Sequence, residues 1–563
     1  AAHAPHRGHV LAGVTTAYET WGELDDAADN AVLLCHAWTG DSHASGRATD
    51  GHPTPGWWEG IVGPGLAIDT DTWFVVCANV LGGCQGSSQP SGSGINGSRG
   101  LLTPDIATRV EWCLIRAVFF MALSFQELQA QLQPGWGCEH SGDGGQFDVL
   151  VVPSLSMDRA LMALVTGAHH YEERQLFSLI RLRDPGVRAV YVTSKLLPEL
   201  VVDAVLELLP GVPTSHARRR LHLFDTDDAS NRPLTEKLLE RPALLKRIGD
   251  LLRPGRSFIS CFVVTDLEKR LSEVLQVPLL GTDPALGYWG SKAGSRALFE
   301  RCGVPHPPGS GLAYNLSELA EATADLWESH PQLRRCVVKL NEGISGEGNA
   351  CLELAPLELA SLSSHERRQR IAAALEQLPM PAAGWRDLVA QQGALVEAWL
   401  EGGERLQSPS VQGTIHPGGR VELVSTHEQI LGGAGGQTYL GCRFPADDAY
   451  RLELMRYGQA VGEALAREGA LERYAVDFIA RRINGHWDLQ AIEVNLRQGG
   501  TTHPTMALRA ITTGQLDPDT GLFLAPTGQA LHQTHRRGLH RHRQPHPSAV
   551  AGAVAGRSDR HRG

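Results

Sequence analysis

One segment constrains the fold of this chain most strongly: residues 474–504 read YAVDFIARRINGHWDLQAIEVNLRQGGTTHP. Two alternating apolar runs flank an Asn-Gly dipeptide, a strong signal for a two-residue turn, so the segment predicts a β-hairpin. Glu493 and Asn495 lie two apart and project from one face, and Asp477 on the other strand can lie opposite them. Hard oxygen ligands on rigid strands suit Mg²⁺ that nucleotide phosphates also hold. The hairpin therefore predicts an enzyme that uses ATP.

Size and composition indicate a multidomain protein with ordinary hydrophobic cores. The chain has 563 residues, of which 42% are apolar and 20% charged, enough for roughly three or four domains. The net charge of -11 argues against a nucleic-acid partner. The 10 cysteines form no CxxC pair, which favours reduced thiols in a cytoplasmic setting over a zinc site or a disulfide framework. Because no apolar run reaches about 18 residues, we expect no transmembrane helix and no membrane partner.

Changes in composition and hydrophobic pattern along the chain predict how it divides into domains. Two short apolar runs, 31–35 and 73–79, indicate buried strands near the N-terminus. A helix expected from Met121 is followed by alternating strand and helix patterns, which favour an open α/β sheet and then mixed α and β structure. The predicted strands of this sheet are 147–153, 188–193 and 257–265. The predicted parts are 1–100, a junction at 101–120, 121–280, 281–526 and a disordered His/Arg-rich tail at 527–563.

Two lysines beside glycine-rich turns predict a phosphate-binding site. Lys339 closes a short apolar strand and leads into a loop whose backbone N–H groups can approach phosphate oxygens. Lys292 follows a Gly/Ser turn that opens a helix, and a helix N-terminus also favours phosphate. The loop residues concerned are Gly343, Ser345, Gly346 and Gly348. The GxxxxGK[ST] spacing of a Walker A loop is absent, so this is a different kind of phosphate site.

The stretch LVEAWLEGGE predicts the nucleoside end of the same site. It is an apolar strand that leads into a turn, and its backbone around Glu397, Trp399 and Leu400 can hydrogen-bond an adenine edge. A glutamate just beyond the turn can accept the ribose hydroxyls. Glu404 fits by its offset from Glu397, and Glu401 is the close alternative.

The order and spacing of these residues resemble the ATP-grasp superfamily. The likeness is closer still to peptide ligases of the pheganomycin type and covers roughly residues 121–526. The matching phrases include VVPSLSMD, HYEERQLF, LLPGVPTSHARRRL, VKLNEGISGEGNA and EVNLRQGGTTHP. The resemblance implies an ATP-grasp fold preceded by an α/β pre-ATP-grasp domain, and a homodimer. The family continues into a short C-terminal domain, whereas here the likeness stops near Thr527, so the tail looks like a reading-frame shift or a foreign end.

The same resemblance implies amide-bond formation. ATP would phosphorylate a small-molecule carboxylate, and an amino-acid or peptide amine would then displace phosphate. Lys292 and Lys339 would hold the α- and β-phosphates, while the glycine loop closes over the γ-phosphate and excludes water. Asp477, Glu493 and Asn495 would hold Mg²⁺ ions that bridge the phosphates.

Three further residues have two alternative roles each in this scheme. Arg497 is expected either to bind the substrate carboxylate or to steady the tetrahedral oxyanion. His427 and His503 lie near the expected substrate loops, where a structural role is the equal alternative. Taken singly, any of the charged residues would more often be an ordinary surface residue. Their joint occurrence in the family order is what favours the site.

The N-terminal hundred residues resemble a different family, the homoserine O-acetyltransferases of the α/β-hydrolase fold. The phrases AYETWGEL, NAVLLCHAWTGDSH and PGWWEGIVGPGLAIDTDTWFVVCANVLGGCQGSS carry this likeness. It implies an oxyanion-hole N–H near Trp38 and Thr39, but no G-x-S-x-G nucleophile elbow follows anywhere in the chain. We therefore expect a partial hydrolase-fold fragment, poorly ordered over much of residues 1–120, ahead of a ligase whose native start is Met121.

Three hypotheses follow from the sequence. The first is an ATP-dependent carboxylate–amine ligase that uses Mg²⁺. The second is a homoserine O-acetyltransferase, which needs a serine nucleophile that the sequence lacks. The third is an inactive fusion product whose altered C-terminus prevents closure of the site. The ligase accounts for most of the chain and comes first.

Overall fold

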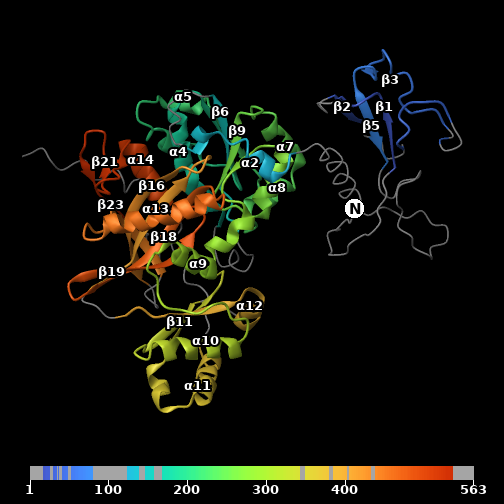
Figure 1. Cartoon of the computed structure of the whole chain (residues 1–563). Helices are drawn as coiled ribbons and strands as arrows, with labels where there is room; N and C mark the ends of the chain where they lie inside the picture. Colours follow the sequence, from blue (N-terminus) through green and yellow to red (C-terminus); the bar gives the residue numbers. More distant parts are fainter. Residues whose placement is uncertain are drawn as a thin grey trace, which may run out of the picture. The chain divides into compact units, whose positions relative to one another are not determined.

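The computed structural model describes residues 17–25, 30–34, 36, 41–48, 52, 54–79, 123–137, 146–156, 168–342, 349–378, 384–401, 405–432 and 438–536. These residues fall into two compact units, Ala1–Ser124 and Phe125–Gly563, and each is described by itself (Figure 1). No helix among the described residues is long and apolar enough to cross a membrane.

The first unit contains a small mixed sheet. Its strands are β1 (Tyr18–Trp21), β2 (Ala31–Leu34) and β5 (Phe74–Ala78), while β3 (Val62–Gly63) and β4 (Ile68–Asp69) form a separate 2-stranded sheet. The central strand β5 pairs antiparallel with β1 and parallel with β2. A small core that includes Val75 and Cys77 lies against this sheet. The two strands predicted in this region are thus confirmed, while Cys35, Trp38 and Thr39 lie outside the described residues.

The second unit begins with a parallel α/β sheet of strand order β10-β9-β6-β7-β8. The strands are β6 (Phe147–Val152), β7 (Val187–Thr193), β8 (Leu221–Asp225), β9 (Ser257–Cys261) and β10 (Leu279–Leu280). The helices are α2 (Phe125–Gln129), η1 (Pro134–Gly137), η2 (Ala168–Arg183), α4 (Glu199–Leu206), α5 (Thr214–Arg218), α6 (Leu234–Leu239), α7 (Pro242–Gly249) and α8 (Asp266–Leu275). Alternate residues of β6 enter two separate cores, Val149 one and Leu150 the other. A parallel sheet buried on both faces explains the continuous apolar run that predicted this strand.

The predicted boundaries of one strand and one helix in this region need correction. The strand expected to continue to Thr265 ends at Cys261. Thr265 instead caps α8, where its side chain accepts a hydrogen bond from Leu267 and Glu268 completes a capping box. Capping positions stand outside both strand and helix, which is why an apolar run alone overestimated the strand. The helix expected from Met121 begins at Phe125, and Met121 lies outside the described residues.

A smaller α+β region follows the parallel sheet. It contains the antiparallel sheet β12-β11-β13, on which α10 packs through β13, and α11 packs against α10 (Figure 1). The strands are β11 (Arg335–Leu340), β12 (Asn349–Glu353) and β13 (Ala394–Ala398). The helices are η3 (Pro284–Gly290), α9 (Lys292–Cys302), α10 (Leu316–Ser329), η4 (Ala355–Leu357), η5 (Leu359–Ser361), α11 (Ser364–Glu376) and α12 (Trp385–Gln392).

A 7-stranded antiparallel sheet completes the unit, with β19 paired to β18 off the path β14-β18-β15-β16-β17-β23. Its strands are β14 (Arg405–Gln407), β15 (Pro409–Ile415), β16 (Val421–Gly432), β17 (Thr438–Phe444), β18 (Glu472–Ile483), β19 (His486–Asn495) and β23 (Gln533–Arg536). A separate 3-stranded sheet contains β20 (Gln515–Leu516), β21 (Phe523–Leu524) and β22 (Ala530–Leu531). Helix α13 (Arg451–Arg467) packs on β15 and β16, and α14 (Thr502–Thr512) follows the hairpin β18–β19 (Figure 1).

Regular structure reaches further along the chain than the sequence indicated. The tail was predicted to be without structure from residue 527, but β22 and β23 lie beyond that point, and β23 pairs with β17. The reason is that an edge strand recruits its neighbour through main-chain hydrogen bonds, which need no hydrophobic periodicity in the added segment. Residues 537–563 lie outside the described residues.

The buried side chain of Glu172 makes the stability of the fold depend on pH. Glu172 is 5% exposed. Its carboxylate accepts hydrogen bonds from the backbone N–H of Ser194 at 2.5 Å and from the Ser194 hydroxyl at 2.6 Å. Lys237 in turn donates to the Ser194 hydroxyl at 2.9 Å. Burial raises the pKa of Glu172 to about 7, against an ordinary value of 4.5, although the two hydrogen bonds from Ser194 oppose the rise.

We predict that Glu172 makes stability fall between about pH 4.5 and pH 7. A carboxyl whose pKa is raised by folding stabilises the fold below its unfolded pKa, and this stabilisation is lost as the pH rises through the folded value. The size of the effect is at most roughly 3 kcal/mol, from 1.36 kcal/mol for each pKa unit. Thermal unfolding of the wild type and of Glu172→Gln at pH 5 and pH 8 measures it. An equal pH dependence in both proteins would contradict the prediction.

Candidate functional site

The hairpin of β18 and β19 brings three predicted metal ligands together. Asp477 pairs directly with Glu493 across the two strands. Asn495 lies diagonally opposite, and its side-chain amide donates to Asp477 Oδ2 at 3.2 Å. The turn has φ angles of 50° and 81° at Asn484 and Gly485. Both fall in the left-handed region that a two-residue hairpin turn requires, which explains why this Asn-Gly dipeptide predicted the fold correctly.

The two carboxylates of the hairpin share one charged environment. Burial, and then the neighbouring Glu493 carboxylate, raise the pKa of Asp477 to about 6. Burial would also raise the pKa of Glu493, but the Lys292 ammonium more than offsets it and the pKa is lowered. Gln429 donates to Asp477 Oδ1 at 2.9 Å. Two close carboxylates and an amide oxygen form the donor set that Mg²⁺ prefers, so the residues fit that ion.

Lys292 is held at the start of α9 and faces the hairpin. Ser291 caps the helix, with its hydroxyl accepting from the Gly294 N–H at 3.1 Å. The Lys292 ammonium donates to Glu493 Oε2. The Ser295 hydroxyl accepts from the Val494 N–H at 3.0 Å and so fastens α9 to β19. The predicted phosphate ligand thus stands at a helix N-terminus, where the backbone dipole also favours an anion.

Lys339 takes part in a buried ion triad. It donates to Glu397 Oε2, and Arg296 donates to Glu397 Oε1 at 3.0 Å. Glu397 is 2% exposed. Burial would raise its pKa, but the Lys339 and Arg296 charges lower it instead. Arg296 was not assigned a role from the sequence. The signal for it was its spacing of four residues from Lys292, which places both side chains on one face of α9.

The predicted adenine segment lies directly after β13. The Trp399 N–H donates to the Arg335 carbonyl at 3.3 Å, so this donor continues the sheet pairing rather than facing a ligand. Arg335 also lies over the Trp399 ring, 5.3 Å from its centroid. Glu401, the alternative ribose ligand, forms an ion pair with Arg335. Glu404 lies outside the described residues, as do the loop residues Gly343, Ser345, Gly346 and Gly348.

Arg497 reaches the same group of charges from the end of β19. Burial lowers its pKa, while the Glu493 and Asp477 carboxylates raise it and so limit the fall. Its guanidinium donates to the Gln498 carbonyl at 3.1 Å. The Gln498 N–H donates to the Phe262 carbonyl at 3.2 Å, which anchors this segment to the chain just beyond β9. Arg497 is therefore placed between the parallel sheet and the hairpin carboxylates.

The two histidines that the sequence singled out lie in different environments. His427 is 1% exposed within β16, and its ring lies 5.2 Å from the Phe444 ring, centroid to centroid. Burial lowers its pKa to about 3, so it is neutral and belongs to the core. His503 lies in the first turn of α14. Of the two, His427 fits the structural alternative.

Comparison with known proteins identifies relatives of most of the chain. The sequence model of the family described as "IQCH-like, ATP-grasp" matches residues 285–379. The L-propargylglycine--L-glutamate ligase of Streptantibioticus cattleyicolor is 30% identical over 408 residues, which are 71% of this chain and 81% of that protein. The biotin carboxylase domain of the Hydrogenobacter thermophilus 2-oxoglutarate carboxylase has a TM-score of 0.41 and 15% identity, covering 67% of this chain and 73% of that one.

A second set of relatives matches only a short segment of the chain. The homoserine O-acetyltransferase of Thermobifida fusca is 62% identical over 90 residues, 16% of this chain and 24% of that enzyme. That of Leifsonia xyli is 64% identical over 84 residues, 15% of this chain and 21% of that enzyme. The chain thus spans less than a quarter of these enzymes. By its similarity over most of its length to a complete ligase, and by its ATP-grasp segment, the chain belongs to the ATP-grasp carboxylate–amine ligases.

Proposed function

We propose that this ligase joins an amino-acid or other small carboxylate to the amine of an amino acid or peptide. The observation that carries the proposal is the group formed by Asp477, Glu493 and Lys292, in which two carboxylates and one ammonium meet at a helix N-terminus. The relative from Streptantibioticus cattleyicolor carries two amino acids in its name, and this supports amino-acid substrates here. A cytoplasmic setting and a homodimer are parts of the same proposal.

The reaction proceeds in two steps whose atoms balance. A carboxylate oxygen of the first substrate attacks the γ-phosphorus of ATP, and ADP leaves with the electrons of the broken P–O bond. The amine of the second substrate then attacks the acyl carbon, phosphate leaves, and the nitrogen loses a proton. Water must be kept away because it would hydrolyse the acyl phosphate.

Charged residues of the chain hold the nucleotide in this scheme. The Lys292 ammonium, which donates to Glu493, brings one positive charge toward the phosphate oxygens. Lys339 brings a second positive charge, held in place by Glu397. Asp477, Glu493 and Asn495 would hold Mg²⁺, which when bound neutralises the negative charge of the phosphates. Both lysines act as point charges rather than as proton donors.

Arg497 serves the acyl end of the reaction. A guanidinium beside the hairpin carboxylates can pair with a substrate carboxylate or with the oxyanion that forms when the amine attacks. Its partial burial strengthens either interaction, because charges attract more strongly away from water. The two roles differ in whether the interaction exists before the transition state.

We predict that Glu493→Gln and Asp477→Asn each lower substrate-dependent ADP release by about 10²-fold or more, because each removes a charge that would hold the phosphate-bridging cation. The assay measures ADP formed from Mg·ATP with a panel of amino acids and peptides. Asp250→Asn, which alters an exposed surface carboxylate paired with Lys246, is the matched control. ADP release equal to wild type in both hairpin variants would refute this site.

We predict that Arg497→Met lowers kcat/KM for the carboxylate substrate by about 10²-fold. A fall in kcat with unchanged KM assigns Arg497 to the oxyanion, since that interaction exists only in the transition state. A rise in KM with unchanged kcat assigns it to the bound carboxylate. Steady-state kinetics of the variant and the wild type measure both constants, and unaltered kcat/KM would exclude either role.

We predict that Glu397→Gln destabilises the chain by about 3–5 kcal/mol, because it leaves the buried charges of Lys339 and Arg296 without an anion. The matched variant Glu401→Gln removes a partner of Arg335 at a site that is about one-third exposed, and should cost at most about 1 kcal/mol. Urea unfolding of both variants measures the difference. Equal costs would mean that the triad does not hold Lys339 in place.

A further inference from the structure

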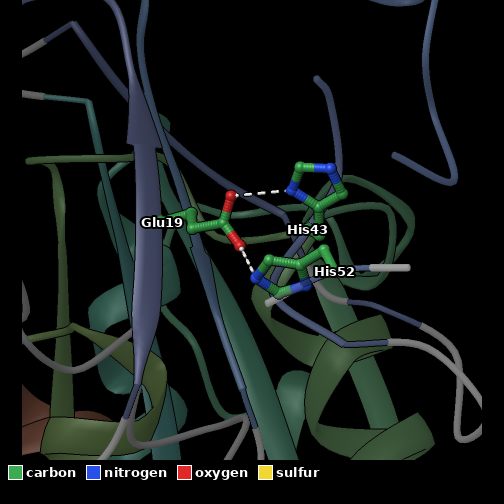
Figure 2. Close-up of side chains that lie close together, drawn as sticks. All are labelled: Glu19, His43 and His52. Atoms are coloured by element: carbon green, nitrogen blue, oxygen red, sulfur yellow. Dashed lines mark hydrogen bonds and ion pairs between the residues drawn. The ribbon is translucent and has the colours of Figure 1, made fainter. Parts of the chain in front are cut away.

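The first unit contains a cluster of one carboxylate and two imidazoles that plays no part in the ligase site. Glu19 lies on β1, while His43 and His52 come from the chain between β2 and β3. Figure 2 shows both rings turned toward the Glu19 carboxylate. The cluster lies wholly within this unit, so its geometry is independent of the rest of the chain.

The donor atoms of the cluster lie at nearly the separations that a metal ion requires. Glu19 Oε2 is 2.9 Å from His43 Nδ1, and Glu19 Oε1 is 2.9 Å from His52 Nε2. One ligand atom from each of the three residues lies within 4.8 Å of the others. Metal–ligand bonds of about 2.0–2.2 Å place two ligands at most about 4.4 Å apart. Small side-chain movements would therefore convert the cluster into a coordination shell.

Hydrogen bonds and strand pairing hold the residues of the cluster in position. The His43 N–H donates to Asp41 Oδ1 at 3.0 Å, and the Trp57 indole donates to the Asp41 carbonyl at 3.0 Å. Glu19 pairs with Cys77 in the sheet. Asp41 Oδ2 also lies 3.4 Å from His52 Nδ1. A carboxylate behind a coordinating histidine orients the ring and raises its basicity, as in many metal sites.

One atom of the cluster remains unsatisfied. The His43 side chain is 8% exposed, and its Nε2 has no hydrogen-bond partner among the described residues. An unpaired polar atom in the interior costs about 1–3 kcal/mol. The ring also stacks on His52 with centroids 4.4 Å apart. The unpaired Nε2 is not the nitrogen that faces Glu19, so the case for a cation rests on His43 Nδ1 and His52 Nε2, which both face this carboxylate.

We propose that Glu19, His43 and His52 bind a divalent first-row transition metal ion, with Zn²⁺ as the natural occupant. Two imidazole nitrogens favour such an ion over Mg²⁺ or Ca²⁺, which prefer oxygen ligands. Three protein ligands leave at least one coordination position open, which is the arrangement of a reactive rather than a closed structural site. The site is chemically distinct from the oxygen ligands at Asp477 and Glu493.

The test is titration of the full chain with Co²⁺, followed by the visible absorption of the bound ion and by displacement with Zn²⁺. Histidines near the C-terminus would also bind metal, so the parent protein carries His535, His540, His542 and His546 changed to alanine. We expect one tight Co²⁺ site in this parent, displaced by Zn²⁺ and not by Mg²⁺. Glu19→Gln and His52→Gln should each weaken binding by more than the about 10- to 100-fold that loss of an outer-shell partner costs.

Controls separate loss of a ligand from loss of fold. His52 is 20% exposed and lies outside any strand, so His52→Gln should leave the unit folded. Tryptophan fluorescence, to which Trp57 and Trp58 contribute, checks this in each variant. His330→Gln, which changes a histidine of the second unit, should bind Co²⁺ like the parent. The proposal is overturned if the parent shows no Co²⁺ absorption, or if the folded Glu19→Gln and His52→Gln variants bind Co²⁺ as tightly as the parent.

Discussion

The contact between Lys292 and Glu493 is the interaction on which the arrangement of the ligase site depends. It joins the first residue of α9 to the hairpin, and the hydrogen bond from Val494 to Ser295 repeats the connection one turn later. Without it, the two carboxylates would face each other across the strands with the Arg497 guanidinium and, for Glu493, the Lys339 ammonium left to offset their repulsion. The same lysine therefore stabilises the paired carboxylates and, in the proposed mechanism, provides a charge for the nucleotide.

A second layer of charges supports this contact from the side of β11. Glu397 holds both Lys339 and Arg296, and Arg296 lies on the same helix as Lys292. The two lysines are thus linked through ion pairs to α9, the hairpin and the small sheet. Buried ion pairs contribute little net stability, but breaking one leaves an uncompensated charge. Such a network fixes geometry more than it adds to the free energy of folding.

The sequence predicted the parts of this site that depend on local rules. The Asn-Gly turn and the alternation of β18 and β19 set the register that pairs Asp477 with Glu493, so both residues could be identified from the sequence pattern alone. The triad around Glu397 depends on contacts between distant segments, which no local pattern contains. For the same reason the pairing of β23 with β17 was missed. The capping role of Thr265 was missed although its Thr-x-x-Glu spacing is a local signal, because the apolar run around it favoured a longer strand. Long-range pairing overrides local composition wherever main-chain groups need partners.

The pairing of β23 with β17 has a consequence for how the chain behaves in solution. Without β23, the outer side of β17 would present a row of unpaired N–H and C=O groups, at the end of the sheet that also contains β18 and β19. An uncovered strand of this kind is a template for another molecule. A few polar residues, Gln533–Arg536, thus guard the protein against self-association, and a shortened form lacking them would be prone to aggregate through its own sheet.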